Sequence, residues 1–384
     1  MCIVLVTTGH PDYALIAIDN RDEYILRPTS RPHWWKTQSD TPNREPKCEV
    51  EILSSRDEQR AERGTWLGMT KGGNFAVLTN YRELNTHDAA HPVHAKRSRG
   101  GMVTAWLGAH PDEGIKDFVN RMLEGREVKD IGGFSLLCGK LRKVKGEKRI
   151  EPLAIMSNRS DHIDEVPWIA GDRGTTCGLS NAIYVHANIR DSSPQVDLLN
   201  GAPEHESLQE EEVWPKIKLG QKLLRNTVAA AARDGLTEEQ LCESLFKILD
   251  ADDFPATHDM DLEEGIPYLK DSIFVPAFGG KSHQAEFLAA QARGPVPKLA
   301  HNNGAKALTL VSRPDDQPNG FQTGLYGTQR QTVILVDWEG NVTYRERALW
   351  DENGNPIPRG QGDETFRFTI DGFVQEEDMQ KGKL

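Results

Sequence analysis

The amino-acid sequence predicts a single layered domain of the α+β class, with mostly antiparallel sheets and one large core. Segments follow the order β-rich, helical, β-rich, helical, β-rich along the 384 residues. Turn chemistry separates neighbouring apolar runs near both ends of the chain, which predicts β-hairpins there. No repeat of fixed period is visible. One layered domain suits this order better than two separate ones, because early and late hairpins can pair into common sheets.

The bulk composition narrows the classes of function. A formal net charge of −12 disfavours nucleic acid or an anionic membrane surface as the main partner, and leaves room for a local basic patch that holds a small anion. No apolar run approaches the roughly 20 residues of a membrane helix. The apolar stretch Met1–Thr7 has no basic region before it and is too short for a signal peptide. We therefore expect an intracellular, cytoplasmic protein.

Cysteine and histidine usage predicts free thiols and no metal site. The five cysteines are odd in number, widely spaced and without a CxxC pair, as in a reducing compartment. His91 and His94 have no further ligand at a sensible spacing beyond Asp88.

The first 80 residues are interpreted as hairpins. Ile3–Thr8 and Tyr13–Ile18 are continuous apolar runs around the turn 9–12, so both faces of these strands are expected to be buried. A second hairpin spans Trp66–Thr79. Residues 40–63 are charged and irregular, which favours a surface insertion.

Helices and strands then alternate. Helical spacing is expected at Gly101–Leu107 and Pro111–Leu123. Strands follow at Gly133–Cys138 and Pro152–Met156, on either side of a basic hairpin tip, and a further strand closes at Gly178–Asn181.

The last half contains two predicted helices and a late hairpin. Residues 208–233 are expected to be a long helix broken near Pro215, and Thr237 to Gln240 form a capping box that opens a helix through Leu249. A hairpin spans Thr332–Arg345. The expected loop insertions are approximately 40–63, 140–150, 190–207, 313–320 and 351–364.

Cys2 is the first candidate functional residue. Methionine is readily removed before a small residue, and removal would leave Cys2 with a free α-amine of reference pKa about 8. Such an amine can take the proton of its own side chain, as in N-terminal threonine nucleophiles. Cysteine is also a small apolar residue that suits a buried strand start, and for Cys2 alone this interpretation is favoured.

Four polar residues, Asn20-Arg21-Asp22-Glu23, follow the second apolar strand. They form either a solvated turn or a partly buried charge network at the mouth of a cleft. A hairpin returns this segment to the level of Cys2. If the segment stays extended, Arg21 and Glu23 share one face, Asn20 and Asp22 share the other, and only one pair looks toward Cys2.

Met1-Cys2-Ile3 followed by this tetrad resembles the NRDE protein family, which is the family of transport and Golgi organisation protein 2. Further matches are spread along nearly the whole chain, and their ordered set is much more specific than any one of them. They are Gly64 to Gly68, Leu78 to Arg82, Ser98 to Gly100, Ser157 to Arg159, Gly178 to Asn181, and Tyr326 to Thr328 with the hairpin after it.

The resemblance implies a fold. The family is similar to N-terminal-nucleophile (Ntn) hydrolases of the penicillin-acylase and bile-salt-hydrolase kind, which have a four-layer αββα sandwich of two mostly antiparallel sheets between helical layers. It implies one such domain over residues 1–384.

The resemblance also implies site residues. The catalytic candidates are Cys2 as nucleophile, Arg21 and Asp22 on the returning strand, and the amides of Asn80 and Asn181. The substrate-binding candidates are Asn20, Glu23, Arg82, Arg99 and Arg330. Taken singly, Asn80 equally suits a strand-end cap, and Arg21 a structural partner of Glu23 or Asp22.

Two departures from the hydrolase pattern stand out. The hydrolases space their Arg and Asp three apart, whereas Arg21 and Asp22 are adjacent. Gln329 occupies the place expected for a distal Arg, and Arg330 comes one position later. On a regular strand that shift puts Arg330 on the opposite face.

Two functions follow as rival expectations. In the first, Cys2 attacks an amide or thioester without a cofactor, while Asn80 and Asn181 stabilise the oxyanion. In the second, implied by the family's association with Golgi organisation, secretion, and haem and acyl-CoA or lipid homeostasis, the protein binds haem or an acyl-CoA without catalysis. The Golgi and the mitochondrion are then alternatives to the cytoplasm. A third hypothesis, a scaffold without a small-molecule site, fits the polar cluster near Cys2 least well.

Overall fold

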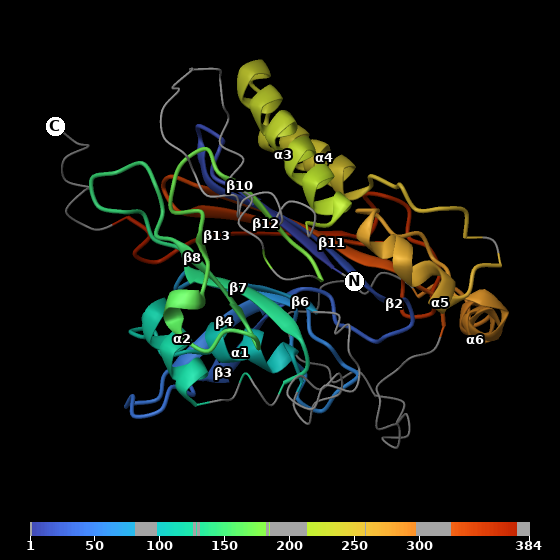
Figure 1. The fold of residues 1–384 in the computed structure, drawn as a ribbon, viewed down its shortest axis with the longest axis horizontal. Helices are drawn as coiled ribbons and strands as arrows, with labels where there is room; N and C mark the ends of the chain where they lie inside the picture. Colours follow the sequence, from blue (N-terminus) through green and yellow to red (C-terminus); the bar gives the residue numbers. More distant parts are fainter. Residues whose placement is uncertain are drawn as a thin grey trace, which may run out of the picture.

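The computed structural model describes residues 2–80, 98–125, 128, 131–181, 184, 213–257, 259–296 and 324–374. These residues form two antiparallel sheets that pack face to face, with helices on the outer face of each (Figure 1). The first sheet has six strands, in spatial order β10 (Thr176–Leu179), β1 (Ile3–Thr7), β2 (Tyr13–Tyr24), β11 (Tyr326–Asp337), β12 (Asn341–Ala348) and β13 (Asp363–Thr369).

The second sheet has seven strands, and their spatial order follows the chain. They are β3 (His33–Gln38), β4 (Glu49–Ser54), β5 (Leu67–Thr70), β6 (Asn74–Asn80), β7 (Phe134–Lys140), β8 (Leu153–Ser157) and β9 (Trp168–Ile169). In the first sheet β2 lies between β1 and β11, so strands from opposite ends of the chain pair, as the sequence predicts.

The helices complete the layers. The bounds are α1 (Gly100–Leu107), α2 (Ile115–Glu124), α3 (Pro215–Asp234), α4 (Glu238–Leu249), α5 (Leu262–Gly265) and α6 (Gly280–Gln291), with 3-10 turns at Ile163–Glu165 and Ile266–Lys270. Helices α1 and α2 pack on the second sheet through Trp106 and Phe118, whereas α3 and α4 pack on the first through Leu224 and Phe246. A third core, which includes Leu15 and Val77, lies between the sheets. The expected four-layer αββα sandwich is therefore present.

Local sequence explains where the long helices begin and end. Pro215 occupies the first turn of α3, where its fixed φ suits a helix start. Gly235, at φ 63°, closes α3 in a left-handed conformation. The predicted capping box of α4 is formed, because the Thr237 side chain accepts from the Gln240 backbone N–H at 3.3 Å. The structure starts α3 at Pro215, and residues 208–212 of the predicted helix lie outside the described residues, so the predicted break near Pro215 stays a prediction.

Other boundaries differ from the predictions. The expected loop 40–63 contains β4, whose residues Ile52 and Leu53 are buried in the core. Helix α2 begins at Ile115, four residues after Pro111, and β13 starts at the end of the expected loop 351–364. The second strand extends to Tyr24, so it includes the polar tetrad. The expected insertions 190–207 and 313–320 lie outside the described residues.

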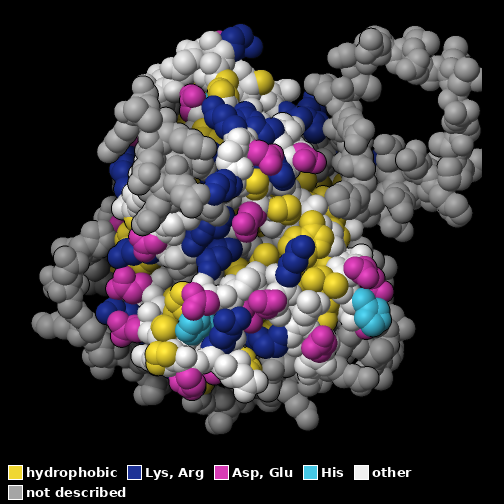
Figure 2. Space-filling model, turned by 90° about the vertical axis from the view of Figure 1, so that its left-hand side faces the viewer, with side chains coloured by type: hydrophobic (Ala, Val, Ile, Leu, Met, Phe, Trp, Pro, Cys, Tyr) yellow, Lys and Arg dark blue, Asp and Glu magenta, His cyan; other side chains and the backbone are white. Residues whose placement is uncertain are grey.

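The surface and the helices bear on possible partners. On the face shown in Figure 2, basic side chains are interspersed with acidic ones, so the described part of this face is not uniformly acidic. Among the described residues, none of the helices combines the length and apolar character that crossing a bilayer requires.

Candidate functional site

Cys2 lies directly before β1 and is buried, with 6% of its surface exposed. Strand β1 pairs with β2 so that Ile3 is opposite Asn20 and Val4 is opposite Asp19. Continued by one residue, this antiparallel register puts Cys2 opposite Arg21. The hairpin thus returns the polar tetrad to the level of Cys2, as the sequence predicts.

Strand alternation decides which tetrad residues share the face of Cys2. Val4 and Ala17 belong to the core between the sheets, whereas Ile3 and Ile18 belong to the core under α3 and α4. Cys2 therefore shares the inter-sheet face with Asp19, Arg21 and Glu23.

Asn20 points the other way, toward the helices. Its side-chain amide donates to the backbone oxygens of Leu249 at 2.8 Å and Ile273 at 2.9 Å. Asn20 therefore fastens the end of α4 to β2.

Arg21 spans the space between the two sheets. Its guanidinium lies 4.3 Å from the centroid of the Trp66 ring, next to β5 in the second sheet. It also donates to the Gln329 side-chain oxygen, and its Nη2 lies 4.0 Å from a Glu23 carboxylate oxygen. Burial lowers the pKa of Arg21, and the nearby Glu23 carboxylate raises it. The cation is held by an aromatic face and polar contacts, which suits a buried guanidinium.

A β-bulge brings a second arginine to the same face. Strand β11 pairs Thr328 with Asp22 and then Arg330 with Arg21, so Gln329 is the extra residue. The sequence analysis put Arg330 on the face opposite to that of Gln329 because it assumed a regular strand, whereas the bulge breaks this alternation and pairs Arg330 with Arg21. Gln329 holds the bulge by donating to the backbone oxygens of Ile25 and Arg27, both at 3.0 Å.

Arg330 is 5% exposed and sits in a polar pocket of the interior. It donates to the Thr29 hydroxyl at 3.2 Å, and its Nε lies 4.0 Å from a Glu346 carboxylate oxygen. Burial lowers the pKa of Arg330 to about 10, against the raising effect of Glu346. Glu346 in turn accepts from the Ser55 hydroxyl at 2.8 and 2.7 Å.

Asp19 belongs to this cluster and was missed by the sequence analysis. It is 1% exposed, and neither carboxylate oxygen has a hydrogen-bond partner within the described part of the chain. Burial raises its pKa well above the ordinary value, and the Asp22 and Glu346 carboxylates raise it further. The available signal was a carboxylate directly after the apolar run that ends at Ile18, at a position that alternation places on the face of Cys2.

Hydrogen bonds along the chain after β10 bring the residues Asn80 and Asn181 near Cys2. The Ser180 hydroxyl donates to the Cys2 backbone oxygen at 2.7 Å, and the Thr79 hydroxyl donates to the Ser180 backbone oxygen at 2.9 Å. The Asn181 amide donates to the Asn80 backbone oxygen. Asn80, Asn181 and Cys2 are thus gathered at one point of the sandwich, and the Asn181 amide keeps a second hydrogen for another acceptor.

The remaining predicted residues do not share the inter-sheet face with Cys2, or lie outside the described part of the chain. Asp22 accepts from the Thr328 hydroxyl at 2.7 Å on the helix-facing side of β2, and burial raises its pKa. Arg99 occupies the N-cap position of α1, on the side of the second sheet. Arg82 lies outside the described residues, as do His91 and His94.

Lys216, on the first turn of α3, is the other residue that the sequence analysis missed. Its side chain is fully buried, and its Nζ has no hydrogen-bond partner among the residues described. Burial lowers the pKa of Lys216, while Asp22 and Cys2 raise it. Its sequence signal was weak, because a lysine after Trp214-Pro215 also suits a solvated helix start.

The Cys2 thiol is protonated in this environment. Burial raises its pKa to about 11, the positive charge of the chain terminus and Arg21 lower it, and Asp19 and Asp22 raise it. A reaction at this sulfur therefore needs a base that takes the proton as the new bond forms.

A family model and several known proteins match this sequence along nearly its whole length. The family model described as Transport and Golgi organisation 2 matches residues 1–351. The human Transport and Golgi organization protein 2 homolog is 25% identical over 342 residues, covering 89% of this chain and 88% of that protein. An uncharacterized protein of Saccharomyces cerevisiae is 25% identical over 365 residues, covering 92% and 93%.

Solved structures were also compared. Penicillin V acylase from Agrobacterium tumefaciens gives a TM-score of 0.37 at 11% identity, over 98% of this chain and 89% of that one. A variant of conjugated bile acid hydrolase from Clostridium perfringens gives 0.40 at 9% identity, over 98% and 99%. The family model alone spans most of the sequence, and this chain therefore belongs to the Transport and Golgi organisation 2 family.

Proposed function

We propose that this protein is a thiol-dependent hydrolase that cleaves an amide or a thioester through Cys2. The observation that carries the proposal is the position of Cys2, buried at the start of β1 on the same face as Arg21 and Asp19. Asn80 and Asn181 approach the same point from β6 and β10. A buried sulfur among cations and amides is suited to a reaction that develops negative charge.

The reaction requires removal of Met1. The freed α-amine of Cys2 takes the thiol proton as sulfur attacks the substrate carbonyl, and a carbon–sulfur bond forms. The proton then passes to the leaving amine or thiol as its bond to the carbonyl carbon breaks. Water attacks the resulting thioester, releases the acid and restores the thiol.

The surrounding side chains have separate roles in this scheme. Arg21, fixed between Trp66 and Gln329, offers a positive charge that favours the thiolate. The amides of Asn80 and Asn181 are the proposed oxyanion donors, and losing one such donor typically costs about 3–4 kcal/mol of transition-state stabilisation. Arg330, which is paired with Arg21, supplies a second positive charge on the same face of the sheet.

Intact-mass analysis of protein purified from cells tests the first requirement. We expect the mass of a chain that begins at Cys2. Addition of an acylating probe, such as an aryl thioester, should then increase this mass by one acyl group, carried by Cys2. Retention of Met1 in all molecules would eliminate the scheme in which the α-amine is the base. Cys2→Ala should abolish the adduct, whereas Cys242→Ala, a buried thiol in the core under α3 and α4, should retain it.

A second candidate function is ligand binding without covalent chemistry. The observation that favours it is the protonated state of the resting thiol, because burial raises the Cys2 pKa to about 11. In this case the protein would hold haem or an acyl-CoA near Cys2 and Arg21, in keeping with a family named for transport and Golgi organisation. Titration with each ligand should show saturable binding that Arg21→Ala weakens, and absence of saturation would eliminate that ligand. Fractionation of cells would then test association with the Golgi or the mitochondrion.

A further inference from the structure

A pocket of about 190 Å³ lies where β7 begins and β8 ends in the second sheet. Its polar lining includes Ser135 on β7, Ser157 at the end of β8 and the adjacent Asn158. Its apolar lining includes Ile155 and the aromatic Tyr184. The proposed reaction leaves this pocket without a role.

The pocket opens on the face that looks toward the first sheet. Leu137 on β7 and Ile155 on β8 belong to the core between the sheets, so strand alternation puts Ser135 and Ser157 on the same face. Ser157 is paired with Ser135, and Ser135 is paired with Thr79 on β6. These three hydroxyl-bearing residues therefore form one row across the second sheet.

The row of hydroxyls ends beside Cys2. The Thr79 hydroxyl donates to the Ser180 backbone oxygen at 2.9 Å, and the Ser180 hydroxyl donates to the Cys2 backbone oxygen at 2.7 Å. Continued by two residues, the register of β1 with β10 puts Asn181 opposite Cys2. Because neighbouring strands lie about 4.8 Å apart, the pocket begins one to two strands, or about 5–10 Å, beyond Thr79. The pocket and Cys2 thus lie at the same end of the sandwich and on the same interior face.

The volume of the pocket limits what it can hold. An engineered cavity of about 150 Å³ holds benzene. A pocket of about 190 Å³ therefore takes a group the size of a six-membered ring with one small substituent. Pockets for larger ligands measure about 300–1,000 Å³, so a whole haem or acyl-CoA does not fit here.

The lining favours an uncharged group that forms hydrogen bonds. Ser135 is 3% exposed, and its hydroxyl has no hydrogen-bond partner within the described ranges of the chain. A buried hydroxyl without a partner is unfavourable, and a polar atom of a ligand would satisfy it. Arg159 and Glu165 also line the pocket, but both are exposed and their formal charges cancel. Nothing in this lining offers a buried countercharge to an ionised ligand.

We propose that this pocket binds an uncharged, hydrogen-bonding group about the size of a six-membered ring, and that this group belongs to the substrate cleaved by Cys2. The second half of this inference rests on the proposed function, which it restricts to amides or thioesters that carry such a group within about 10 Å of the scissile carbonyl. The ring packs on Ile155 and Tyr184, and its polar substituent bonds to Ser135 and Ser157. These contacts are remote from the reacting atoms, so they bind and orient the substrate.

Binding of benzamide to the Cys2→Ala protein tests the pocket without any reaction. We expect saturable binding when benzamide is titrated by calorimetry. Benzoate has the same size and a negative charge, and it should bind about tenfold more weakly because its charge would lose water without gaining a buried cation. 2-Naphthamide is larger by one ring and should also bind about tenfold more weakly, because it overfills the pocket.

Two pocket variants and one control locate the binding. Ser157→Leu fills the pocket and should abolish benzamide binding. Ser135→Ala removes one hydroxyl without adding volume, so it should fold normally and weaken binding about fivefold. Ser244→Leu changes a half-buried serine on α4, outside the pocket, and should leave binding unchanged. Absence of saturable benzamide binding, or equal binding by both pocket variants and the unaltered pocket, would overturn the site.

A pair of thioesters tests the link to Cys2. One is the S-methyl thioester of 4-(4-carbamoylphenyl)butanoic acid, which carries the ring amide three carbons from the carbonyl, and the other is S-methyl thiobutanoate. Mass spectrometry should show that the first acylates Cys2 about tenfold faster, and Ser157→Leu should remove the difference. Equal rates in the unaltered protein would overturn the assignment of the pocket to the substrate. If neither thioester acylates Cys2 while benzamide still binds, the proposed hydrolase fails and the binding pocket stands.

Discussion

At the scale of single residues, the region around Cys2 holds ionisable groups that a protein interior normally excludes. Three of these charges have partners. The ring of Trp66 lies against Arg21, and hydroxyl groups of Thr29 and Ser55 hydrogen-bond to Arg330 and Glu346 respectively. Asp19 and Lys216 have no hydrogen-bond partner in the described part of the molecule, although the Nζ of Lys216 lies 5.7 Å from the centroid of the Trp214 ring. Burial shifts both of them toward their neutral forms, upward for the acid and downward for the amine. Stability is lost wherever pH forces either one to be charged.

Asp19→Asn should stabilise the protein at neutral pH by about 2 kcal/mol, because it replaces a buried carboxylate with a neutral group of similar shape. The folded-state pKa of Asp19 is raised, so its favourable contribution is complete below about pH 4 and is lost as pH rises through the folded-state value. The gain should therefore be larger at pH 7.5 than at pH 4.5 when unfolding free energies are measured in urea. An equal gain at both values would show that Asp19 does not titrate differently on folding.

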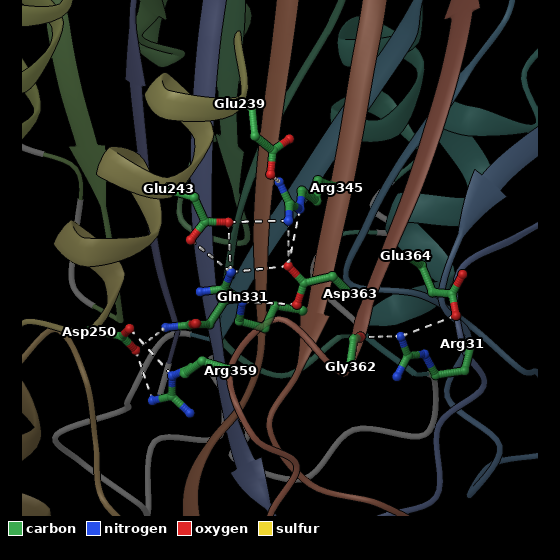
Figure 3. A network of polar contacts seen from close by, with 11 residues as sticks. Arg31, Glu239, Glu243, Asp250, Gln331, Arg345, Arg359, Gly362, Asp363 and Glu364 are labelled. Atoms are coloured by element: carbon green, nitrogen blue, oxygen red, sulfur yellow. Dashed lines mark hydrogen bonds and ion pairs between the residues drawn. The ribbon is translucent and has the colours of Figure 1, made fainter. Parts of the chain in front are cut away.

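At the scale of secondary-structure elements, α4 is fastened to the first sheet by a polar network (Figure 3). Asp363 on β13 accepts from Arg345 and from Arg347 on β12, each at 3.0 Å, and Arg347 also contacts Glu243 on α4 at 3.1 Å. The side chains of Arg347 and Asp363 are 4% and 7% exposed, so these pairs are nearly dry. A helix held in this way keeps its last turn, and the Asn20 contact there, in place.

Asp363→Ala should destabilise the protein by about 3 kcal/mol, because it removes the acceptor that the buried Arg347 shares with the partly buried Arg345. Chemical denaturation at neutral pH measures the loss. The comparison variant is Glu49→Gln, which removes an exposed pair with Lys36 whose side chains are 57% and 51% exposed. That variant should change stability by less than about 1 kcal/mol. Similar losses for both variants would contradict the structural role of the network.

Thr237→Ala should destabilise the protein by about 1 kcal/mol through loss of the α4 cap. Thr237→Ser keeps the hydroxyl and should restore most of the loss, which separates capping from packing. Thermal unfolding of the three proteins checks the order. If the serine variant is as unstable as the alanine variant, the hydroxyl contact does not carry the effect.

The elements differ in how far their sequences determine them. The hairpin Ile3–Thr7 with Tyr13–Tyr24 and the capped helix α4 follow from local signals, namely apolar runs around a turn and a capping box. Strand β4 was missed because its apolar residues Ile52 and Leu53 are few and follow charged ones. Its place depends on pairing with β3 and β5, which a local pattern does not reveal.

The candidate site divides in the same way. Strand alternation and the hairpin correctly grouped Arg21 with Glu23 and brought them to Cys2. Arg330 reached that face only through the bulge at Gln329, which depends on contacts to Ile25 and Arg27 from another segment. Lys216 was not predictable, because its burial depends on how α3 packs across β1. The positions of Arg330 and Lys216 depend on long-range packing and therefore could not be predicted from the local sequence.

At the scale of the whole molecule, the sandwich buries thiols and phenols in several layers at once. Burial raises the pKa of Cys2 to about 11, of Cys242 to about 12 and of Tyr13 to about 12, and it raises the pKa of Cys138 and Tyr344 as well. These groups lie in all three cores or at their edges, so the effect belongs to the fold and not to one site. Unfolding exposes them together and returns each to its ordinary pKa.

Stability should consequently fall steeply above about pH 9. A group whose folded-state pKa is raised contributes fully below its unfolded-state pKa, and that contribution is lost as pH rises through the folded-state value. Each thiol that ionises only after unfolding should give a slope of about −1.4 kcal/mol per pH unit in this range. Urea titrations between pH 8 and 10.5 measure the slope. Cys2→Ser removes one such group, so the slope of its unfolding free energy against pH should be shallower by nearly 1.4 kcal/mol per pH unit, which is about one proton. An unchanged slope would mean that Cys2 is already ionised, or open to solvent, in the folded protein.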